Sequence, residues 1–387
     1  MEKTVNKLIS LIDLIEKDEQ LETTADTGIS KDQTRMVPIN KGNYSMDTDS
    51  REALFDKKRG FGWESEYTEY RKKWSELAQN QIISDYPLLV DLELASVCNL
   101  RCPMCYTITD EFKKQINAKL MNWNLYTKII DEIGGKVPAI RLSLRGEATL
   151  HKKFVECIRY AKSKNIKEVS TLTHGGKLNI DFFREISEAG MDWITVSIDG
   201  TGETYEKIRK PIKFDQIVNN LTEISDYKRQ HGLVRPLIKV QGIWPAIKED
   251  IDRYYNTFAP IADLVAFNPL IDYLSNDTDI DFVSGFMCPQ QYQRLVIGAD
   301  GTVMKCSNDE ENREIIGNAN FETVHELWHG PNMTRVREIQ KEEQGFLKSP
   351  VCQKCYLPRS TSDEEAWVNG RKFIIRNYTK RNQCVGK

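Results

Sequence analysis

The sequence Cys98-Asn99-Leu100-Arg101-Cys102-Pro103-Met104-Cys105 places three cysteines at the spacing C-x3-C-x2-C. A strand-like run, Leu88–Ala95, comes directly before it. We therefore expect the cysteines on a loop that leaves the carboxyl end of a strand. Thiolates are the usual ligands of iron–sulfur clusters, and three of them hold three irons of a four-iron cubane. The fourth iron would stay open, so the pattern predicts a cluster that binds a substrate or cofactor.

This stretch closely resembles the signature of the radical S-adenosylmethionine (radical SAM) enzymes, in which a bulky or aromatic residue, here Met104, precedes the last cysteine. The resemblance covers residues 85–275. It implies that Cys98, Cys102 and Cys105 hold a [4Fe–4S] cluster whose open iron binds S-adenosylmethionine. The alternative is a zinc site, but zinc sites usually pair two C-x2-C or Cys/His arms. No fourth ligand lies nearby in the sequence.

Six strand-like runs alternate with amphipathic helical segments between residues 88 and 268. This alternation predicts an α/β fold with parallel strands and covering helices. It matches the open (β/α)6 partial TIM-like barrel of the radical SAM family, where chemistry lies at the carboxyl ends of the strands. The predicted strands are Leu88–Ala95, Ala139–Arg145, Glu168–Thr173, Trp193–Asp199, Leu237–Ile243 and Leu264–Asn268, and the helices include Leu125–Ile133, Lys153–Lys164, Ile180–Ala189 and Phe214–Gln230.

The second and third strands end in residues that the resemblance assigns to the cofactor. The family has Gly-Gly-Glu after the second strand and contacts the amino group of the cofactor's methionine there. This chain has Arg145 in place of the first glycine and keeps Gly146 and Glu147. Thr173 and His174 stand where family members often have Thr-Asn. His174 is either a proton carrier or a polar residue that caps the turn.

The fourth strand ends in Ser197-Ile198-Asp199-Gly200, and Tyr205, Ile208 and Arg209 follow. This resembles the family's Ser-x-Asp-Gly and Tyr-x-x-Ile-Arg pattern. The resemblance implies that Ser197 and Arg209 hold the cofactor's carboxylate or ribose. It also places the fifth strand near the adenine.

A second cysteine set comprises Cys288, Cys306, Cys352 and Cys355. Between the first two, Asp300-Gly301 favours a hairpin with a tight primed turn. The set resembles the SPASM extension of radical SAM enzymes, or its short form, Twitch. The full SPASM set has seven cysteines, and residues 356–382 contain none. The short form implies one auxiliary [4Fe–4S] cluster, closed by four thiolates and used for electron transfer, and the alternative is a zinc ribbon.

Two thiols and one decoy remain. Cys157 lies on the apolar side of a predicted helix and is expected in the core. Cys384, in a polar tail, is a spare thiol, an extra cluster ligand or the hydrogen-atom donor of an epimerase. His325-Glu326-Leu327-Trp328-His329 matches the H-E-x-x-H pattern of metalloproteases, but SPASM and Twitch proteins carry a similar helix here.

Length and composition bound the remaining choices. For 387 residues we predict three parts: 1–85 with an N-terminal helix, a polar arm and an aromatic helix, 86–275 with the barrel, and 276–387 with the auxiliary domain and tail. The polar arm covers residues 21–60. The aromatic helix, residues 64–82, is either core or an active-site lid. Net charge is −3 with no long apolar run or signal sequence, so we predict a cytoplasmic protein without nucleic-acid or membrane partners.

Together these patterns predict a radical SAM oxidoreductase with two [4Fe–4S] clusters, S-adenosylmethionine and an electron donor such as flavodoxin or ferredoxin. We expect a small hydroxylated, sugar-like substrate that is oxidised or epimerised. Oxidation is favoured, because neither Cys157 nor Cys384 lies at a strand end, where a hydrogen donor would be held rigidly. The alternative is epimerisation or cross-linking of a ribosomally made peptide. Residues 1–85 show no β-hairpin signal of a leader-binding domain, which favours the small molecule.

Overall fold

A computed structural model describes residues 44–116, 119–269, 279–379 and 385. The helix predicted within residues 1–20 and the thiol of Cys384 lie outside these residues. None of the described helices is long and apolar enough to cross a membrane.

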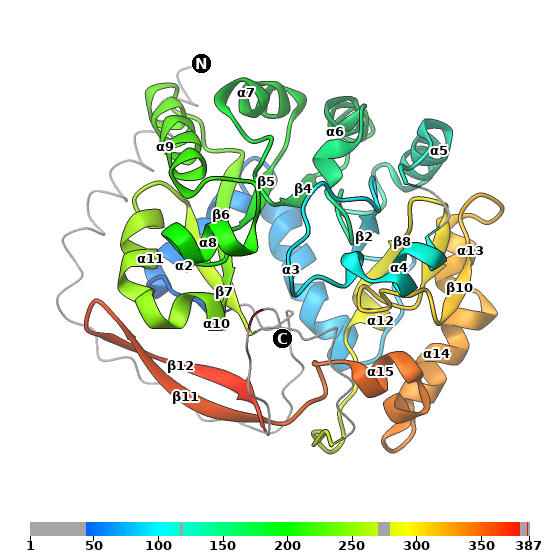
Figure 1. The fold of residues 1–387 in the computed structure, drawn as a ribbon. Helices are drawn as coiled ribbons and strands as arrows, with labels where there is room; N and C mark the ends of the chain where they lie inside the picture. Colours follow the sequence, from blue (N-terminus) through cyan, green and yellow to red (C-terminus); the bar gives the residue numbers. More distant parts are fainter. Residues whose placement is uncertain (1–43, 117–118, 270–278, 380–384, 386–387) are drawn as a thin grey trace.

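Six parallel strands form the centre of the fold, in the spatial order β7-β6-β5-β4-β3-β2. They curve into an open barrel with helices on the outside (Figure 1), so the predicted partial barrel is confirmed. Three strands end earlier than predicted. The residues after Leu92 and Arg141 leave the strands to form site loops, and the strand predicted to reach Asp199 ends at Ser197. The strands are β2 (Leu89–Leu92), β3 (Ala139–Arg141), β4 (Glu168–Thr173), β5 (Trp193–Ser197), β6 (Leu237–Ile243) and β7 (Leu264–Asn268).

The covering helices bury apolar faces against this sheet. In α7 (Ile180–Ala189) the Asn179 side chain caps the first turn, Gly190 ends the helix at φ +97°, and Phe182, Phe183 and Ile186 are buried. The other barrel helices are α4 (Asp110–Gln115), α5 (Trp123–Ile133), α6 (Phe154–Ser163), α8 (Gly202–Ile208), α9 (Phe214–Gln230), α10 (Trp244–Ile247) and α11 (Ile251–Phe258). Short 3-10 helices cover Tyr106–Ile108, Ala148–Leu150, Lys248–Asp250 and Gly345–Lys348.

Part of the predicted polar arm is a helix, so that prediction is wrong for α2 (Asp49–Arg59). The segment folds because its charges meet partners on the barrel. Arg59 donates to the carboxylate of Glu168 at 2.8 and 3.1 Å, and Arg51 donates to two backbone carbonyls beyond α11. Phe55 is buried. Just before this helix, β1 (Tyr44–Ser45) pairs antiparallel with β7.

The aromatic helix α3 (Glu64–Gln79) is part of the core. Its residues Tyr67, Tyr70 and Trp74 cluster with Leu89 and Ala139, the first residues of β2 and β3. That is the amino end of the strands, opposite the cysteine loop. The core interpretation of this helix is therefore confirmed, and the lid interpretation is wrong.

The C-terminal part continues the same sheet. Strand β8 (Arg294–Ile297) pairs parallel with β2, and β9 (Thr302–Met304) and β10 (Ile315–Asn318) follow antiparallel. The predicted hairpin is present, but its primed two-residue turn is not. Gly298 faces Thr302 across three loop residues, with Gly301 at φ +85°, which is the bulged three-residue loop. The predicted domain boundaries at 85 and 275 stay predictions.

The remaining elements pack beside this hairpin and across the barrel. A two-stranded sheet, β11 with β12, runs back toward α11 (Figure 1), where Asn369 N donates to Asp252. Its Phe373 packs on Trp244 and Phe267 at the end of β6 and β7. The sequence analysis did not predict this hairpin. These elements are α12 (Gln290–Gln293), α13 (Val324–His329), α14 (Pro331–Lys341), α15 (Pro350–Lys354), β11 (Thr361–Val368) and β12 (Arg371–Tyr378).

Candidate active site

The three cysteines of the first set lie on the loop that follows β2, as predicted. Cys105 N donates to Cys102 O at 3.0 Å, and Leu100 N donates to the Cys98 sulfur at 3.4 Å. Burial raises the pKa of Cys98 to about 11 and also raises the pKa of Cys102. Because three partly or fully buried thiolates on one loop would need a compensating positive charge, the donor set fits a metal cluster.

These thiols line one cavity of about 220 Å³. The structure brings to it nearly every residue that the resemblance assigned to the cofactor. Thr173 does not line the cavity, but its hydroxyl donates to the Glu147 carboxylate at 2.7 Å. The cavity walls include Cys98, Cys102, Cys105, Met104, Gly146, Glu147, Ser197, Arg209 and Ile243.

Glu147 is held rigidly beside the cysteine loop. Its carboxylate, in a residue 2% exposed, accepts from the Thr149 hydroxyl at 2.6 Å and from His174 N at 2.9 Å. Gly146 brings the chain close to the same loop, since a Cβ there would lie 2.4 Å from Val97 O. Only glycine fits this approach, so the loop and the carboxylate are fixed relative to each other.

His174 caps its own turn. Gly176 N donates to its Nδ1 at 2.9 Å, so Nε2 carries the hydrogen and faces Asn99 Oδ1 at 2.8 Å. Burial lowers the pKa of His174. The capping interpretation is confirmed. The proton-carrier interpretation stays a prediction, since His174 also lines the cavity and its Nε2 lies 3.4 Å from Glu147 Oε2.

Arg209 is oriented by a carboxylate from the preceding strand end. Its Nε donates to Asp199 Oδ2 at 2.7 Å, and Asp199 is 1% exposed. Since one edge of the guanidinium is fixed in this way, Arg209 can present its remaining N–H groups to a ligand in the cavity. Ser197 lies on the same wall.

A buried ion pair at the same cavity was missed by the sequence analysis. Arg145, the residue in place of a family glycine, donates through Nε and Nη2 to both oxygens of Glu93 at 2.6 Å. Its Nη1 donates to Glu310 O at 3.1 Å and to Asn312 Oδ1 at 2.8 Å. The available signal was a carboxylate in the otherwise apolar run Leu92–Ala95. The pair ties the barrel to the loop that follows Cys306.

The second cysteine set also comes together. Cys288, Cys306, Cys352 and Cys355 line one small cavity in the C-terminal part. Lys305 Nζ lies 3.3 Å from the sulfur of Cys352.

These four thiols are buried or nearly so, and burial raises the pKa of Cys355 to about 12 and raises those of Cys288 and Cys306. Asn308 Nδ2 donates to the sulfur of Cys355 at 3.2 Å. N–H donors to thiolate sulfur stabilise metal-bound thiolates. The set therefore fits an enclosed four-thiolate centre.

The other sequence candidates do not form a catalytic group. Cys157 is fully buried in α6, as expected for a core thiol. In the H-E-x-x-H stretch, the Glu326 carboxylate accepts from both the backbone and the hydroxyl of Thr323 in a capping box. It is thus engaged in holding the helix end and does not serve as a peptidase base.

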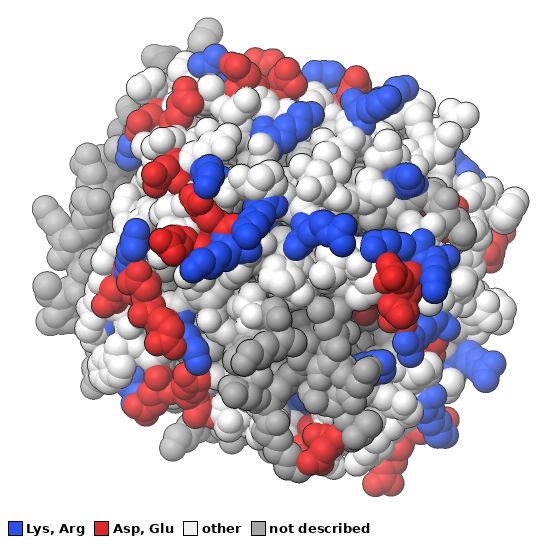
Figure 2. All heavy atoms as spheres, in the orientation of Figure 1, with Lys and Arg blue, Asp and Glu red and all other residues white. Residues whose placement is uncertain are grey.

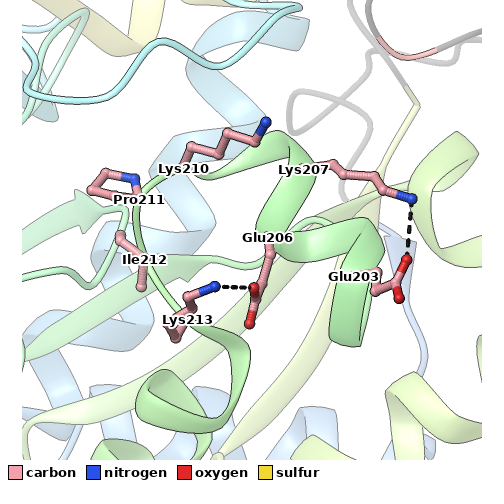
Figure 3. A pocket seen from close by; sticks show the side chains of 7 residues that line it. All are labelled: Glu203, Glu206, Lys207, Lys210, Pro211, Ile212 and Lys213. Carbon is pink, nitrogen blue, oxygen red and sulfur yellow. Dashed lines mark hydrogen bonds and ion pairs between the residues drawn. The ribbon is translucent and has the colours of Figure 1, made fainter.

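A larger hollow of about 410 Å³ lies at the rim, after α8 (Figure 3). Lys207 pairs with Glu203 at 3.3 Å and Lys213 with Glu206 at 2.6 Å, so its charges are largely satisfied locally. Figure 2 shows cationic side chains in a band across the middle of the same face of the molecule. The hollow contains none of the thiols described above, so the cysteine-lined cavity is the better candidate active site.

Comparison with known proteins agrees with this geometry. The radical SAM superfamily model matches residues 92–243, and the SPASM iron–sulfur cluster-binding domain matches residues 288–356.

The tungsten-containing aldehyde ferredoxin oxidoreductase cofactor-modifying protein of Pyrococcus furiosus is 24% identical, over 72% of this chain and 91% of that protein. A probable GTP 3′,8-cyclase of Methanococcus maripaludis is 28% identical, over 46% of this chain and 66% of that protein.

Streptococcus suis SuiB, in a crystal structure with its precursor peptide SuiA, shares the fold. The TM-score is 0.51 and the identity 13%, over 92% of this chain and 84% of SuiB. The two matched families divide the chain as the two thiol sets do. The chain therefore belongs to the radical SAM enzymes and carries a C-terminal SPASM iron–sulfur cluster-binding domain.

Proposed function

We propose that this enzyme oxidises a small hydroxylated, sugar-like molecule, using a substrate-binding cluster at Cys98, Cys102 and Cys105 and one closed auxiliary cluster. The observation that carries the proposal is the contrast between the two thiol sets. Three thiols open onto a cavity whose walls combine apolar side chains with the charged groups of Glu147 and Arg209, whereas four lie in an enclosed cage. An open iron serves binding, and a saturated cluster serves electron transfer.

When bound, S-adenosylmethionine and the first cluster would supply the radical chemistry that removes a hydrogen atom from a carbinol carbon. The auxiliary cluster would supply the one-electron acceptor needed to complete the oxidation to a ketone, with the hydroxyl proton lost to solvent. The chain's own residues would position these groups. Glu147 offers a fixed carboxylate to an ammonium group, and Arg209 offers its free donors to a carboxylate or ribose. Gly146 allows the close approach, Met104 lies on the same wall, and the Thr173 hydroxyl holds the Glu147 carboxylate from behind it.

The substrate class is supported by the relatives. One is named for modifying a cofactor and another as a GTP cyclase, and both names denote small molecules. The likeness to SuiB, at 13% identity, concerns the fold and does not favour a peptide. A peptide substrate remains an outcome of the experiment below.

Oxidation is favoured over epimerisation by the thiols of the described residues. Outside the two cysteine sets these residues contain one other buried thiol, Cys157, and it is fully enclosed in α6. It cannot reach a substrate radical. Cys384 lies outside the described residues and is tested directly as a hydrogen donor below.

The electron donor in this proposal is a flavodoxin or ferredoxin. Support comes from the cationic band of Figure 2, which lies at the level of α4 and α8 beside the cysteine loop. The last turns of these helices carry Lys113, Lys114 and Lys207, of which Lys113 and Lys207 also pair with Asp110 and Glu203. Positive patches steer acidic partners at low ionic strength.

The first test is anaerobic reconstitution. The wild type should bind about eight irons and release 5′-deoxyadenosine from S-adenosylmethionine, by the arithmetic of two cubanes. The variant with Cys98, Cys102 and Cys105 all replaced by Ala should keep about four irons and release none. A wild-type count near four would remove the auxiliary cluster from the proposal.

Substrate class is then read from a panel of nucleotide sugars, aminoglycoside-like rings and short peptides. A ketone from a sugar supports the proposal, and a modified peptide overturns it. Cys352→Ala with Cys355→Ala should retain cleavage of S-adenosylmethionine and lose product. In deuterated solvent, a deuteron placed on carbon by the wild type and not by Cys384→Ala would show epimerisation with Cys384 as donor.

A further inference from the structure

Two histidines of α13 converge with an aspartate from the segment before β2. His325 Nε2 lies 3.2 Å from Asp85 Oδ1, and His329 Nε2 lies 2.9 Å from Asp85 O. The two imidazole centroids are 4.5 Å apart. One ligand atom from each of the three side chains lies within 4.8 Å of the others. The group is on the surface, away from both cysteine sets in the sequence and outside both of their cavities.

The spacing of these atoms matches a tetrahedral metal site. Zinc binds imidazole nitrogen and carboxylate oxygen at about 2.0–2.2 Å, so two ligands of one ion lie about 3.3 Å apart. Of the proposed ligand atoms, His325 Nε2 and Asp85 Oδ1 lie 3.2 Å apart, close to that value, and the ligand atom of His329 lies within 4.8 Å of both. Only side-chain rotation is needed for an ion to replace the hydrogen bonds.

The backbone that carries the ligands is already fixed. Trp328 Nε1 donates to Ser84 O at 2.8 Å, which holds α13 against the segment of Asp85. The Glu132 carboxylate of α5 accepts from Val324 N at 2.7 Å and from His325 N at 2.9 Å. Figure 1 shows α13 beside α5 at the edge of the molecule. A site assembled before binding loses little freedom when the ion arrives.

We propose that Asp85, His325 and His329 bind one divalent transition-metal ion, with zinc the best match, and water in the remaining position. Two imidazoles with a carboxylate suit zinc, whereas calcium and magnesium take oxygen ligands. The ion joins the auxiliary domain to the start of the barrel. It is not a peptidase centre, because Glu326 is held in the capping box of its own helix.

The test counts metals on the cluster-loaded enzyme. Reconstituted protein is equilibrated with zinc, passed through a desalting column and analysed for zinc and iron by mass spectrometry. The wild type should retain one zinc per chain more than His325→Gln and Asp85→Asn, at equal iron. His231→Gln changes an exposed histidine at the end of α9 and should retain the wild-type zinc, as should Glu326→Gln.

Equal zinc in the wild type and His325→Gln overturns the proposal, as does absence of zinc from the wild type. Zinc that had entered a cysteine set would show as lost iron and would persist in Asp85→Asn. A second measurement covers variants that fold poorly. Added zinc should raise the melting temperature of the wild type, since it binds the native state, and leave that of Asp85→Asn unchanged.

Discussion

Replacing Arg145 by Met should destabilise the junction between the barrel and the SPASM domain. The side chains of Arg145 and Glu93 are 3% and 0% exposed. Removing one partner of such a buried pair leaves the other charge uncompensated, which costs about 3–5 kcal/mol. Ala299 N still donates to Glu93 at 3.1 Å, which offsets part of the loss. We therefore expect about 3 kcal/mol.

The effect should be concentrated in the loop after Cys306, because Arg145 donates there to Glu310 O and Asn312. Native-state hydrogen exchange reports the free energy of opening for each segment. In Arg145→Met, amides of residues 307–314 should exchange about a hundredfold faster, the equivalent of about 3 kcal/mol. Arg335→Met, an exposed position on α14, is the matched control and should change exchange by less than about 0.5 kcal/mol.

A double variant separates the pair from its surroundings. Glu93→Gln removes the buried charge that Arg145→Met leaves behind, so the two changes together should cost less than their sum. Strict additivity would refute the explanation by an uncompensated charge. Unchanged exchange in residues 307–314 of Arg145→Met would refute the role of this pair in joining the domains.

Three further outcomes follow from single side chains. Gly146→Ala should lower the rate of 5′-deoxyadenosine release about five- to a hundredfold, since overpacking beside Val97 O costs about 1–3 kcal/mol; an unaltered rate would show that the loop can move away. Lys305→Met should shift the auxiliary cluster to a more negative potential in a redox titration followed by EPR, because a donor to the Cys352 sulfur is lost; an unshifted potential would contradict this. The pKa of Asp263 is lowered from 3.8 to about 2 although burial opposes this, because Lys228 and Lys58 lie beside it. The stabilisation by the Asp263 carboxylate is therefore complete above about pH 4 and lost as pH falls toward 2. Asp263→Asn should lower the unfolding free energy of the cluster-free protein by about 2 kcal/mol at pH 7 and by less below pH 4. A cost that does not change with pH would contradict the assignment.

The barrel could be predicted from the local sequence pattern, because the residues that begin and end several of its strands can be recognised in the sequence. The bounds predicted for β4, β6 and β7 match those of the structure. β4 lies between Lys167 and His174, β6 follows Pro236, and β7 lies between Asp263 and Pro269. Between such breaks, burial of parallel strands on both faces favours runs of apolar and β-branched residues. The residues assigned to the cofactor could then be placed together, because the carboxyl ends of parallel strands meet at one edge of the sheet.

Segments held by distant charges could not be predicted in this way. The composition of residues 49–59 reads as a polar arm, although local helix signals are present: Thr48 caps the first turn, and acidic and basic residues stand in the first and last turns. What the sequence could not predict is the docking of α2 on the barrel through Arg59 and Glu168. The hairpin of β11 and β12 likewise depends on Phe373 meeting Trp244 and Phe267. Such contacts join residues far apart in the sequence, so the local hydrophobic periodicity does not predict them.

The departure at Arg145 shows what the cofactor motif requires and what it leaves free. Gly146 must be glycine, since Val97 O lies 2.4 Å from the position of a Cβ. The side chain of residue 145 instead points to Glu93 and to the loop at Asn312, where a long cation fits. A motif read as two glycines thus contains one steric requirement and one variable position. In this enzyme the side chain at the variable position runs from the cavity of the first cysteine set to the loop that follows Cys306. The residue that departs from the family pattern therefore adds a buried contact between the barrel and the C-terminal part, beside the pairing of β2 with β8.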